Sequence, residues 1–520
     1  MFKSEGGNEM AFMDAYSGAW TNDHAAHLLR RTGFSASSSV VEQIKNLDIT
    51  RAVNQIMDFP DSDDDFEIKL RKSLPAPDSL SRLQSWWLFR MAYSPYAAQE
   101  QLTLFLHDTI VSEYSKINTG ISNRVKNGND GSESGQSCHV DFGLAPDKLR
   151  KRRIASGLMQ DQNQLLRKLG PGLYGELLKA VTRNPAMLIY LDNQVNKKGR
   201  AQENYAREIM ELFSLGVGNY SEEDVRETAR AFTGQTINKS CKYNWPYTYI
   251  YSSSRHDTKP KTVFNQTFNH SDGNQDTDYV IDLIMNHISN AVEISPFHDQ
   301  LPAAAIYISW KILTWYVYEN LLISHPAVFE LAQYMYQENY HIRKTLKKLF
   351  NSEFFYNDAW KWAMIKHPAD YIVTPIRTLG LTRVNLYTAA KSYLSGMGMS
   401  LLEPPNVAGW NHGKAWINSG YLLNRYNYAN YLSTSAVATD TWTDKLLDNG
   451  IFASSTDHSA MIEWFTTELI GTALYDKQIQ SLNAFLTQIE GSSGSAAARY
   501  RRKIRGLIHV MMALPQYQLK

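Results

Sequence analysis

The densest polar cluster that could do acid–base chemistry lies at residues 203–211. Helical spacing through this stretch places its apolar side chains on one side and its polar ones on the other. Glu208 lies next to the apolar boundary, where burial could raise the pKa of its carboxyl and suit it to act as an acid or a base. Arg207 could bind an anionic or hydroxyl-rich ligand. The candidate catalytic residues here are Glu203, Arg207 and Glu208, with Asn204 as a candidate substrate ligand.

The same cluster also fits a solvated helix face. Arg207 lies four residues after Glu203 and four before Glu211. Pairs of this spacing stabilise a helix by only about 0.2–0.5 kcal/mol each. The residues alone therefore leave the catalytic and the solvated interpretations open.

His107 and Asp108 form a second candidate catalytic pair. They end an apolar run, so their side chains are expected near a helix interior rather than in water. His107 could act as a general base oriented by a carboxylate, or as a metal ligand, and a hydrogen-bonded core histidine fits the same pattern. The best set of metal ligands would be His107, Asp108, Glu208 and Glu211, which suits Mg²⁺, Ca²⁺ or Mn²⁺ better than zinc.

Polar residues in loops supply candidate substrate ligands. His256 and Asp257 precede Lys259 and Lys261 in a segment with little helical or strand pattern. Polar residues in loops have less structural work to do than those in helices, although a plain surface loop is the alternative. Arg425, further along the chain, is another candidate ligand.

The segment at residues 404–418 is the least helical part of the sequence. Two prolines and two glycines there would fix a shaped loop. Trp410 and Trp416 would offer flat apolar faces, and Asn406 and Asn418 would add amide groups, a combination that suits stacking on sugar rings. The alternative is a loop that plugs the helical core through its two tryptophans.

The composition excludes several classes of protein. The 520 residues include 53 Lys and Arg against 52 Asp and Glu, so no net charge draws the chain to nucleic acid. Hydrophobic residues make up 43% and charged residues 20%, which indicates a folded core. No phosphate-binding loop, nucleophile elbow, HExxH or dinucleotide motif is present, so no cofactor is predicted.

The sequence shows neither a membrane span nor a disulfide framework. The longest apolar stretch, Ala303 to Ile323, carries Lys311 and Glu319. Because charges are costly in lipid, it predicts a buried core helix and no transmembrane segment. Cys138 and Cys241 could form one disulfide or remain two thiols.

Helical spacing dominates the elements that must position these residues, and strand-like alternation is scarce. The predicted fold is therefore mostly α, one large multi-helix domain over residues 24–520. A minor β-hairpin is expected near Tyr243 to Tyr251, a loop over Ser252 to Asp276, and a mobile insertion at 121–137. Residues 1–23 are expected to be a flexible segment without a signal peptide, which indicates a cytoplasmic or already trimmed chain.

The individual helices follow from the same spacing. They are predicted at Ala25 to Arg31, Leu83 to Ala92, Ala98 to Ser112, Leu158 to Leu169, Leu173 to Thr182, Asn204 to Leu215, Thr277 to His287, Pro302 to Asn320, Ala327 to Glu338, Ile342 to Asn351, Ala460 to Thr472, Asp476 to Gln488 and Ala496 to Met512. Gly216 supplies a stop after the helix at residues 204–215, and Ser221 with Asp224 is a capping pattern that opens another helix.

Five segments, taken together, resemble a bacterial family. They are HLLRRTGF at His27 to Phe34, LFLHD at Leu104 to Asp108, NPAMLIYLDNQVNKKGRAQENYAREIMELFSLGVGNYSEEDVRETARAFTG at Asn184 to Gly234, EPPNVAGWNHGKAWINSGYLLNRY at Glu403 to Tyr426 and ALPQYQ at Ala513 to Gln518. In content and order they resemble domain of unknown function 1800 (DUF1800), over nearly the whole chain. The resemblance implies a predominantly helical protein, often exported and often encoded beside a sulfatase-like partner family. It implies no particular reaction.

The chain departs from this family at two positions that bear on metal binding. The family commonly has His-Asn-His where this chain has His107, Asp108 and Thr109, and often has a histidine where this chain has Phe213. Neither Thr109 nor Phe213 can serve as a strong metal ligand. We therefore predict no stoichiometric zinc or iron, which elemental analysis of the protein would check.

Two functions of different class follow from these observations. The first is an exported hydrolase acting on polysaccharide or another polyhydroxylated or sulfated substrate, with Glu208 and His107 as acid and base. The second is a non-catalytic glycan-binding or assembly protein that works beside a sulfatase-like partner. A half-buried Glu208 near His107 would favour the enzyme, whereas complete ion pairing of Glu208 would favour the second function.

The site is expected to be assembled from segments far apart in the sequence. We expect Glu203, Arg207, Glu208 and His107 to lie together with the loop from Asn406 to Asn418. This expectation rests on their belonging to the most distinctive motifs of the chain.

Overall fold

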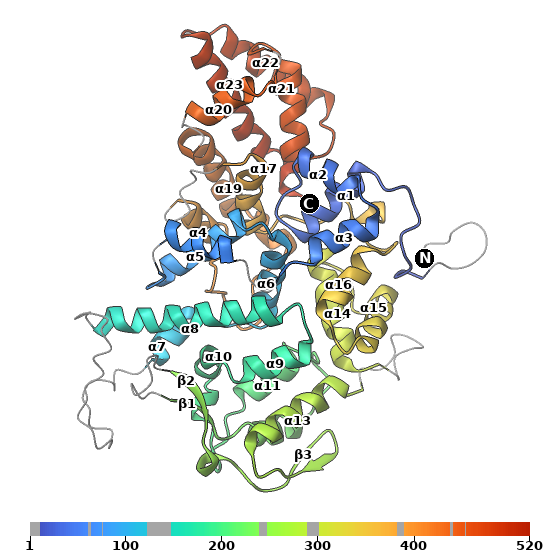
Figure 1. Ribbon diagram of the computed structural model, residues 1–520, viewed down its shortest axis with the longest axis vertical. Coiled ribbons are helices and arrows are strands. Elements are labelled where there is room, and N and C mark those ends of the chain that lie inside the picture. Colours follow the sequence, from blue (N-terminus) through green and yellow to red (C-terminus); the bar gives the residue numbers. More distant parts are fainter. Residues whose placement is uncertain are drawn as a thin grey trace.

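The computed structural model describes residues 11–60, 64–74, 76–121, 147–238, 247–288, 301–381, 389–436, 440–452 and 454–520. Within these ranges most residues are helical, and the strands form two small antiparallel sheets (Figure 1). The predicted mostly α fold is thereby confirmed. Cys138, Cys241 and the insertion predicted at 121–137, apart from residue 121, lie outside the described ranges.

The helices fall into three sets along the chain. The N-terminal set is α1 (Asn22–Thr32), α2 (Ser38–Lys45), α3 (Ile49–Met57), α4 (Asp64–Ser73), α5 (Leu80–Tyr93), α6 (Ala97–Thr109) and α7 (Tyr114–Gly120). The middle set is α8 (Asp147–Leu169), α9 (Tyr174–Thr182), α10 (Pro185–Tyr190), α11 (Asn204–Glu211), α12 (Glu222–Ala231) and α13 (Gly273–Asn286). The C-terminal set is α14 (Ala303–Tyr316), α15 (Pro326–Gln337), α16 (Ile342–Phe350), α17 (Pro368–Thr378), α18 (Lys391–Gly396), α19 (Ser419–Tyr431), α20 (Asp440–Asp448), α21 (His458–Phe465), α22 (Asp476–Glu490) and α23 (Ala496–Ala513).

The long helix α8 separates two parts of the molecule. Below it in Figure 1 lie α7, α9 to α11 and α13 with the strands, and above it lie α1 to α6 together with α17 and α19 to α23. Segments from both ends of the chain meet in the upper part, where α17 packs against α5. The structure therefore joins residues that the sequence keeps hundreds of positions apart.

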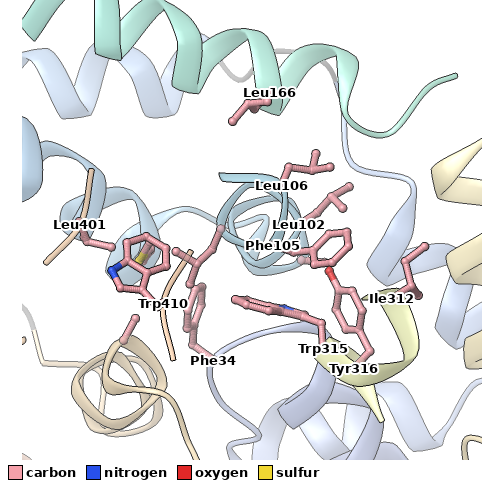
Figure 2. Packing of buried hydrophobic residues seen from close by; sticks show 14 of the residues in the cluster. Phe34, Leu102, Phe105, Leu106, Leu166, Ile312, Trp315, Tyr316, Leu401 and Trp410 are labelled. Atoms are coloured by element: carbon pink, nitrogen blue, oxygen red, sulfur yellow. The ribbon is translucent and has the colours of Figure 1, made fainter. Parts of the chain in front are cut away.

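Helix α6 runs through the hydrophobic core. Every residue from Ala98 to Thr109 is buried, and α1, α3, α5 and α8 pack around the helix. Figure 2 shows Leu106 facing Leu166 of α8, while the rings of Phe105 and Trp315 of α14 have centroids 5.7 Å apart. Because α6 is enclosed, the polar residues at its C-terminal end are held in fixed positions.

A buried carboxylate ties three of these helices together. Glu100 of α6 has no exposed side-chain surface and accepts hydrogen bonds from Arg90 Nε of α5 at 3.0 Å and from Arg167 Nε and Nη2 of α8, both at 2.8 Å. Trp87 Nε1 donates a further bond at 3.2 Å. Arg90 and Arg167 supply the positive charges that make a buried carboxylate tolerable.

The sheets differ in part from the prediction. Strand β2 (Thr248–Tyr251) lies within the predicted hairpin segment, but it pairs with β1 (Gln235–Asn238), in the register Gln235 to Tyr251. The loop predicted over residues 252–276 is wrong in its centre, where β3 (Lys261–Val263) pairs with β4 (Gln266–Phe268). The two turn residues, Phe264 and Asn265, have φ of 49° and 61°. Such turns usually contain glycine, so the phenylalanine at this position gives no sequence signal for a hairpin.

Part of the segment at residues 11–21 contacts α15 and the end of α16, although only Met13 of these residues is buried. The flexibility predicted over 1–23 stays a prediction. Met13 is 4% exposed and its backbone nitrogen donates to Glu330 Oε2 at 2.8 Å. The backbone nitrogen of Tyr16 donates to the carbonyl oxygen of Asn351 at 2.8 Å. In the described part of the chain, no helix combines the length and the hydropathy that a membrane crossing requires.

The helix predicted at residues 204–215 is present in its first two turns as α11. It ends at Glu211, so the predicted residues 212–215 lie in a turn rather than in a helix. Gly216 then adopts a φ of +78°, a conformation that glycine reaches at no steric cost. The predicted capping pattern is confirmed, because Ser221 and Asp224 form a capping box at the start of α12.

Candidate functional site

The C-terminal end of α6 holds the loop at residues 403–418. The carboxylate of Asp108 accepts a hydrogen bond from the backbone nitrogen of Trp410 at 2.7 Å, and its second oxygen lies 3.0 Å from His412 Nε2. Gly409 has a φ of +92°, and a Cβ there would lie 2.4 Å from Asp108 Oδ1. The structure therefore joins Asp108 to the predicted loop and uses the carboxylate to shape it.

A substitution at Gly409 tests this close approach. Gly409→Ala is expected to destabilise the protein by about 2–3 kcal/mol, because a side chain there is strained and meets Asp108. Urea denaturation measures the change in the free energy of unfolding. Gly450→Ala is the matched control, since Gly450 also has a positive φ, of +69°, but nothing within 4 Å of its Cβ position. Equal losses in the two variants would contradict a specific role for the contact with Asp108.

His107 is enclosed by aromatic rings. Its imidazole is edge-on to Trp87 with centroids 5.3 Å apart and lies 5.6 Å from the centroid of Trp410, and its Nε2 has no hydrogen-bond partner. Burial lowers the pKa of His107 to about 4, against the opposing charge of Asp108. The ring is therefore neutral near pH 7, and only 1% of the residue is exposed.

The two tryptophans of the loop belong to the hydrophobic core. Trp410 is 3% and Trp416 is 2% exposed, so neither ring offers a free face for stacking on a sugar. Asn406 accepts a bond from the backbone nitrogen of Ala408 at 2.9 Å. Asn418 caps α19 by accepting from the nitrogen of Tyr421 at 3.0 Å. In this conformation the loop plugs the core, and the two asparagines shape its backbone.

The outer face of α11 is paired with its neighbour α12. Arg207 forms a two-pronged ion pair with Glu222, with both N–O distances at 2.8 Å, while Glu203 is more distant at 3.6 Å. Asn204 is exposed. Arg207 and Glu203 thus lie near the surface, and the structure does not bring them to His107 or to the 403–418 loop.

Glu208 differs from its neighbours on α11. It is half-buried, and among the described residues its carboxyl takes part in no hydrogen bond or ion pair. Burial raises the pKa of this carboxyl, the charge of Glu211 raises it further, and Arg207 opposes the shift. A raised pKa favours the protonated form of the carboxyl, which is the form that can donate a proton.

Tyr190 of α10 lies near Glu208 and near two further carboxylates. Burial raises the pKa of the Tyr190 hydroxyl, and the charges of Glu113, Glu208 and Glu403 raise it further. Glu403 begins the 403–418 loop, accepts a bond from the backbone nitrogen of Ser115 at 3.2 Å, and also has a pKa raised by burial. Three carboxylates therefore act on the Tyr190 hydroxyl, and Glu208 is one of them.

Helix α14 interacts with both predicted catalytic clusters, with Glu211 of α11 through Tyr307 and with Asp108 of α6 through Lys311. Lys311 Nζ lies 5.7 Å from the ring centroid of Tyr307, whose hydroxyl pKa is raised by burial and by the charge of Glu211. Burial lowers the pKa of Lys311, and the charge of Asp108 opposes that shift. Gly216 lets the end of α11 approach Tyr307, because a Cβ there would lie 2.8 Å from the ring. The sequence signalled Lys311 only as a charge within an apolar run.

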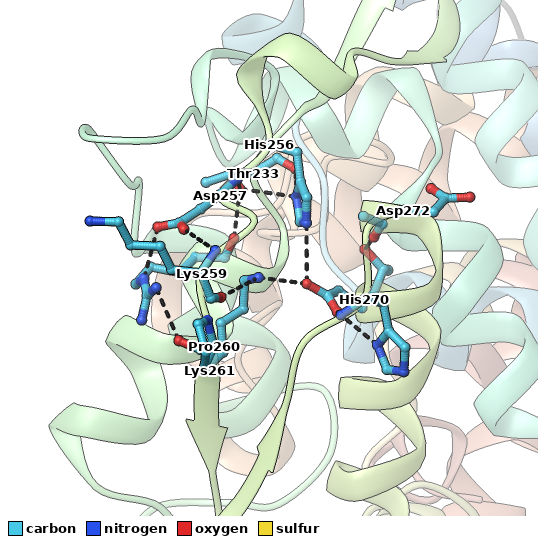
Figure 3. A network of polar contacts seen from close by, with 12 residues as sticks. Thr233, His256, Asp257, Lys259, Pro260, Lys261, His270 and Asp272 are labelled. Atoms are coloured by element: carbon cyan, nitrogen blue, oxygen red, sulfur yellow. Dashed lines mark hydrogen bonds and ion pairs between the residues drawn. The ribbon is translucent and has the colours of Figure 1, made fainter.

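The remaining candidates belong to other parts of the fold. His256 is 1% exposed, its Nδ1 donates to the carbonyl oxygen of Thr233 at 2.9 Å, and its Nε2 lies 3.2 Å from Asp276 Oδ2 (Figure 3). Asp257 accepts from Arg230 Nε at 2.9 Å. These partners connect the segment after β2 to α12, to the turn after α12 and to α13, so His256 is a core residue rather than a surface ligand.

Arg425 is likewise enclosed. Its guanidinium donates to Gln518 Oε1 at 3.0 Å and to the carbonyl oxygen of Lys366 at 2.7 Å, and the residue has no exposed surface. It therefore connects α19 to the C-terminal segment of the chain. Nothing in this arrangement places it beside Glu208.

The described residues offer no ready-made metal site. Across those ranges, no group of three or more His, Cys, Asp or Glu side chains is arranged to hold a metal ion. His107 is sealed among aromatic rings, and Asp108 is engaged with the 403–418 loop. The absence of stoichiometric zinc or iron stays a prediction for elemental analysis.

Fold and site together define a mostly helical protein in which a half-buried, unpaired glutamate lies among further carboxylates and tyrosines. A family model described as "Protein of unknown function (DUF1800)" matches residues 27–126 and 148–519. The chain therefore belongs to this family, and the resemblance noted in its motifs is confirmed. No curated protein and no solved structure matches the chain.

Proposed function

We propose that the protein is a hydrolase acting on polysaccharide or another polyhydroxylated substrate, with Glu208 as the proton donor to the leaving group. The observation that carries the proposal is the half-buried carboxyl of Glu208, whose pKa is raised and which has no partner among the described residues. Hydrolases of glycosidic bonds commonly use one carboxyl kept protonated by its surroundings and a second that stays charged.

Glu211 is suited to be the second carboxylate. It lies three residues after Glu208, so the two side chains are neighbours on the helix surface. Its Oε2 accepts a hydrogen bond from the hydroxyl of Tyr220 at 2.6 Å, which holds the carboxylate in place. The negative charge of Glu211 in turn favours a proton on Glu208. His107 is not assigned a proton transfer, because its ring is enclosed.

The charges near the site favour a neutral substrate over a sulfated one. Glu113, Glu208 and Glu403 act together on Tyr190, whereas Arg207 is neutralised by Glu222. A sulfate group would be repelled by such surroundings. Hydroxyl groups can donate to the same carboxylates. A neutral polyhydroxylated chain is therefore the substrate class that we propose.

A screen of the purified protein against a glycan and sulfated-glycan library tests the proposal. We expect turnover of a neutral glycan, and a loss of at least about 10²-fold in Glu208→Gln. The rate should fall as the pH rises through the raised pKa of Glu208, because the donor must be protonated. Glu223→Gln, on the exposed face of α12, is the matched control and should keep the activity. Undiminished turnover in Glu208→Gln would refute the role of this carboxyl.

The alternative function is a non-catalytic glycan-binding or assembly protein beside a sulfatase-like partner. One separate observation favours it: an apolar groove of about 700 Å³ between α22 and α23, lined by Leu482, Phe485, Val510 and Leu514. Tyr475 at its edge is 72% exposed and could stack on a sugar or a partner side chain. Binding of glycans without turnover, unchanged in Glu208→Gln, would favour this second function.

A further inference from the structure

We infer that a small cavity between α1, α17 and the π-helix at Thr466–Ile470 binds the anionic oxygen atoms of a sulfate, phosphate or carboxylate group. The cavity has a volume of about 20 Å³ and is partly open to solvent. Its charged lining consists of Arg30, Lys366, Asp370, Glu468 and Lys520. It is separate from the Glu208 site, and the inference does not depend on the proposed hydrolase.

Lys366 is the first observation behind this inference. The residue is 4% exposed, and its ammonium group has no acceptor among the described residues. Its Nζ lies 3.8 Å above the ring centroid of Tyr517, which compensates the charge only in part. Another buried lysine of the chain has a full partner, since Lys261 Nζ lies 2.7 Å from Asp276. Burial lowers the pKa of Lys366 to about 7, so an anion would favour its charged form.

Arg30 is the second cation without an acceptor. Its guanidinium stacks on Trp362 at 3.9 Å and donates no hydrogen bond within the described ranges, and its Nε is buried without a partner. Gly471 makes room for this group, because a Cβ there would lie 2.8 Å from Arg30 Nη1. Asp23, whose charge acts on Arg30, is already paired with Lys361 at 3.1 Å.

The two carboxylates of the lining already have partners. Asp370 forms an ion pair with Lys520 and accepts from Gln101 Nε2 at 2.7 Å. Glu468 accepts from the backbone nitrogen of Ser38 at 3.2 Å and from its hydroxyl. Three cations therefore face two anions in the lining, and one bound anion would restore neutrality.

The size of the cavity limits how the ligand enters. A space of this volume holds one or two water-sized atoms. One or two oxygen atoms can therefore reach Arg30 and Lys366, while the rest of the ligand stays outside. A guanidinium beside an ammonium is a typical partner for such oxyanions. The lining includes Arg30 and Phe34, which both belong to the sequence motif HLLRRTGF.

Equilibrium dialysis of the whole protein with labelled sulfate, at an ionic strength fixed with chloride, tests the inference. We expect one saturable equivalent, displaced by phosphate or acetate according to which oxyanion fits best. Lys366→Met and Arg30→Met should each bind at least about tenfold more weakly, because each removes a charged hydrogen-bond donor. Arg82→Met, at a surface arginine that is 48% exposed, is the control and should bind normally.

A second measurement on the unchanged protein locates the anion. Bound sulfate should slow the modification of the Lys366 amine by an acylating reagent, tenfold at about ten times the Kd. Lys344, which is 53% exposed, should react at the same rate with and without sulfate. The inference is overturned if no saturable equivalent binds, or if binding is unchanged in both Lys366→Met and Arg30→Met. Equal slowing at Lys366 and Lys344 would also overturn it.

Discussion

Replacing Glu100 with alanine is expected to lower the free energy of unfolding by about 3–5 kcal/mol. The substitution would leave the guanidinium of Arg167 without a carboxylate partner and that of Arg90 with Glu67 alone. Both arginine side chains are 6% exposed. A buried charge without a partner is among the most destabilising changes a core can suffer. Urea denaturation of the wild-type and variant chains measures the difference.

Two further variants sharpen this result. Glu100→Gln keeps the volume and removes only the charge, so most of the loss should remain. Glu176→Ala, which removes a 62% exposed carboxylate paired with Lys179, should change stability by no more than about 1 kcal/mol. If Glu100→Ala lost no more than Glu176→Ala, the buried network would not be the tie between α5, α6 and α8 that its contacts indicate.

Asp276→Asn is expected to lower the free energy of unfolding by a similar amount, about 3–5 kcal/mol. Asp276 accepts bonds from Lys261 Nζ at 2.7 Å and from His270 Nδ1 at 2.8 Å, and Lys261 has no exposed side-chain surface. The amide would leave this ammonium buried without a counter-charge (Figure 3). Asp278→Asn is the control, since Asp278 is 43% exposed beside Arg183.

The same carboxylate gives the stability a defined pH dependence. Burial opposes ionisation of Asp276, but bonds from His256 and Lys261 outweigh it and lower its pKa from 3.8 to about 2. Its contribution is therefore fully present above pH 3.8 and is lost as the pH falls through about 2. The difference in stability between the wild-type protein and Asp276→Asn should shrink over that range. A difference that stayed constant down to pH 2 would contradict the assignment.

Much of the fold could be predicted from the sequence because helices depend on local patterns. The spacing of apolar residues and the Ser221 cap predicted α11 and α12 closely. Helix α19 was missed, since its sequence, SGYLLNRYNYANY, mixes tyrosine and asparagine without a clear apolar stripe. The hairpin of β3 and β4 was missed because its turn uses Phe264 where glycine is expected. Sequence patterns for helices and turns fail where tertiary packing stabilises a residue that its local conformation disfavours.

The site was predictable only in part. Sequence spacing indicated that Glu208 lies at an apolar boundary, and the structure finds it half-buried with a raised pKa. It also singled out Asp108 and the loop with Trp410, which are hydrogen-bonded. The sequence could not show that Trp410 faces inward. A tryptophan suits a ligand-binding surface and a hydrophobic core equally well, so its presence does not distinguish the two. Lys311 was missed for the converse reason: its interaction with Asp108 exists only once α14 and α6 have come together.

The bond between Asp108 and the backbone of Trp410 joins positions 302 residues apart in the chain. Closing so long a loop costs conformational entropy that only the finished packing repays. A chain synthesised as far as residue 400 already contains α6, but it lacks the amide that Asp108 holds. The 403–418 loop therefore takes its shape late in folding, after the helices of both halves have met. The enclosure of His107, which Trp410 helps to form, is therefore complete only in a chain that has folded as a whole.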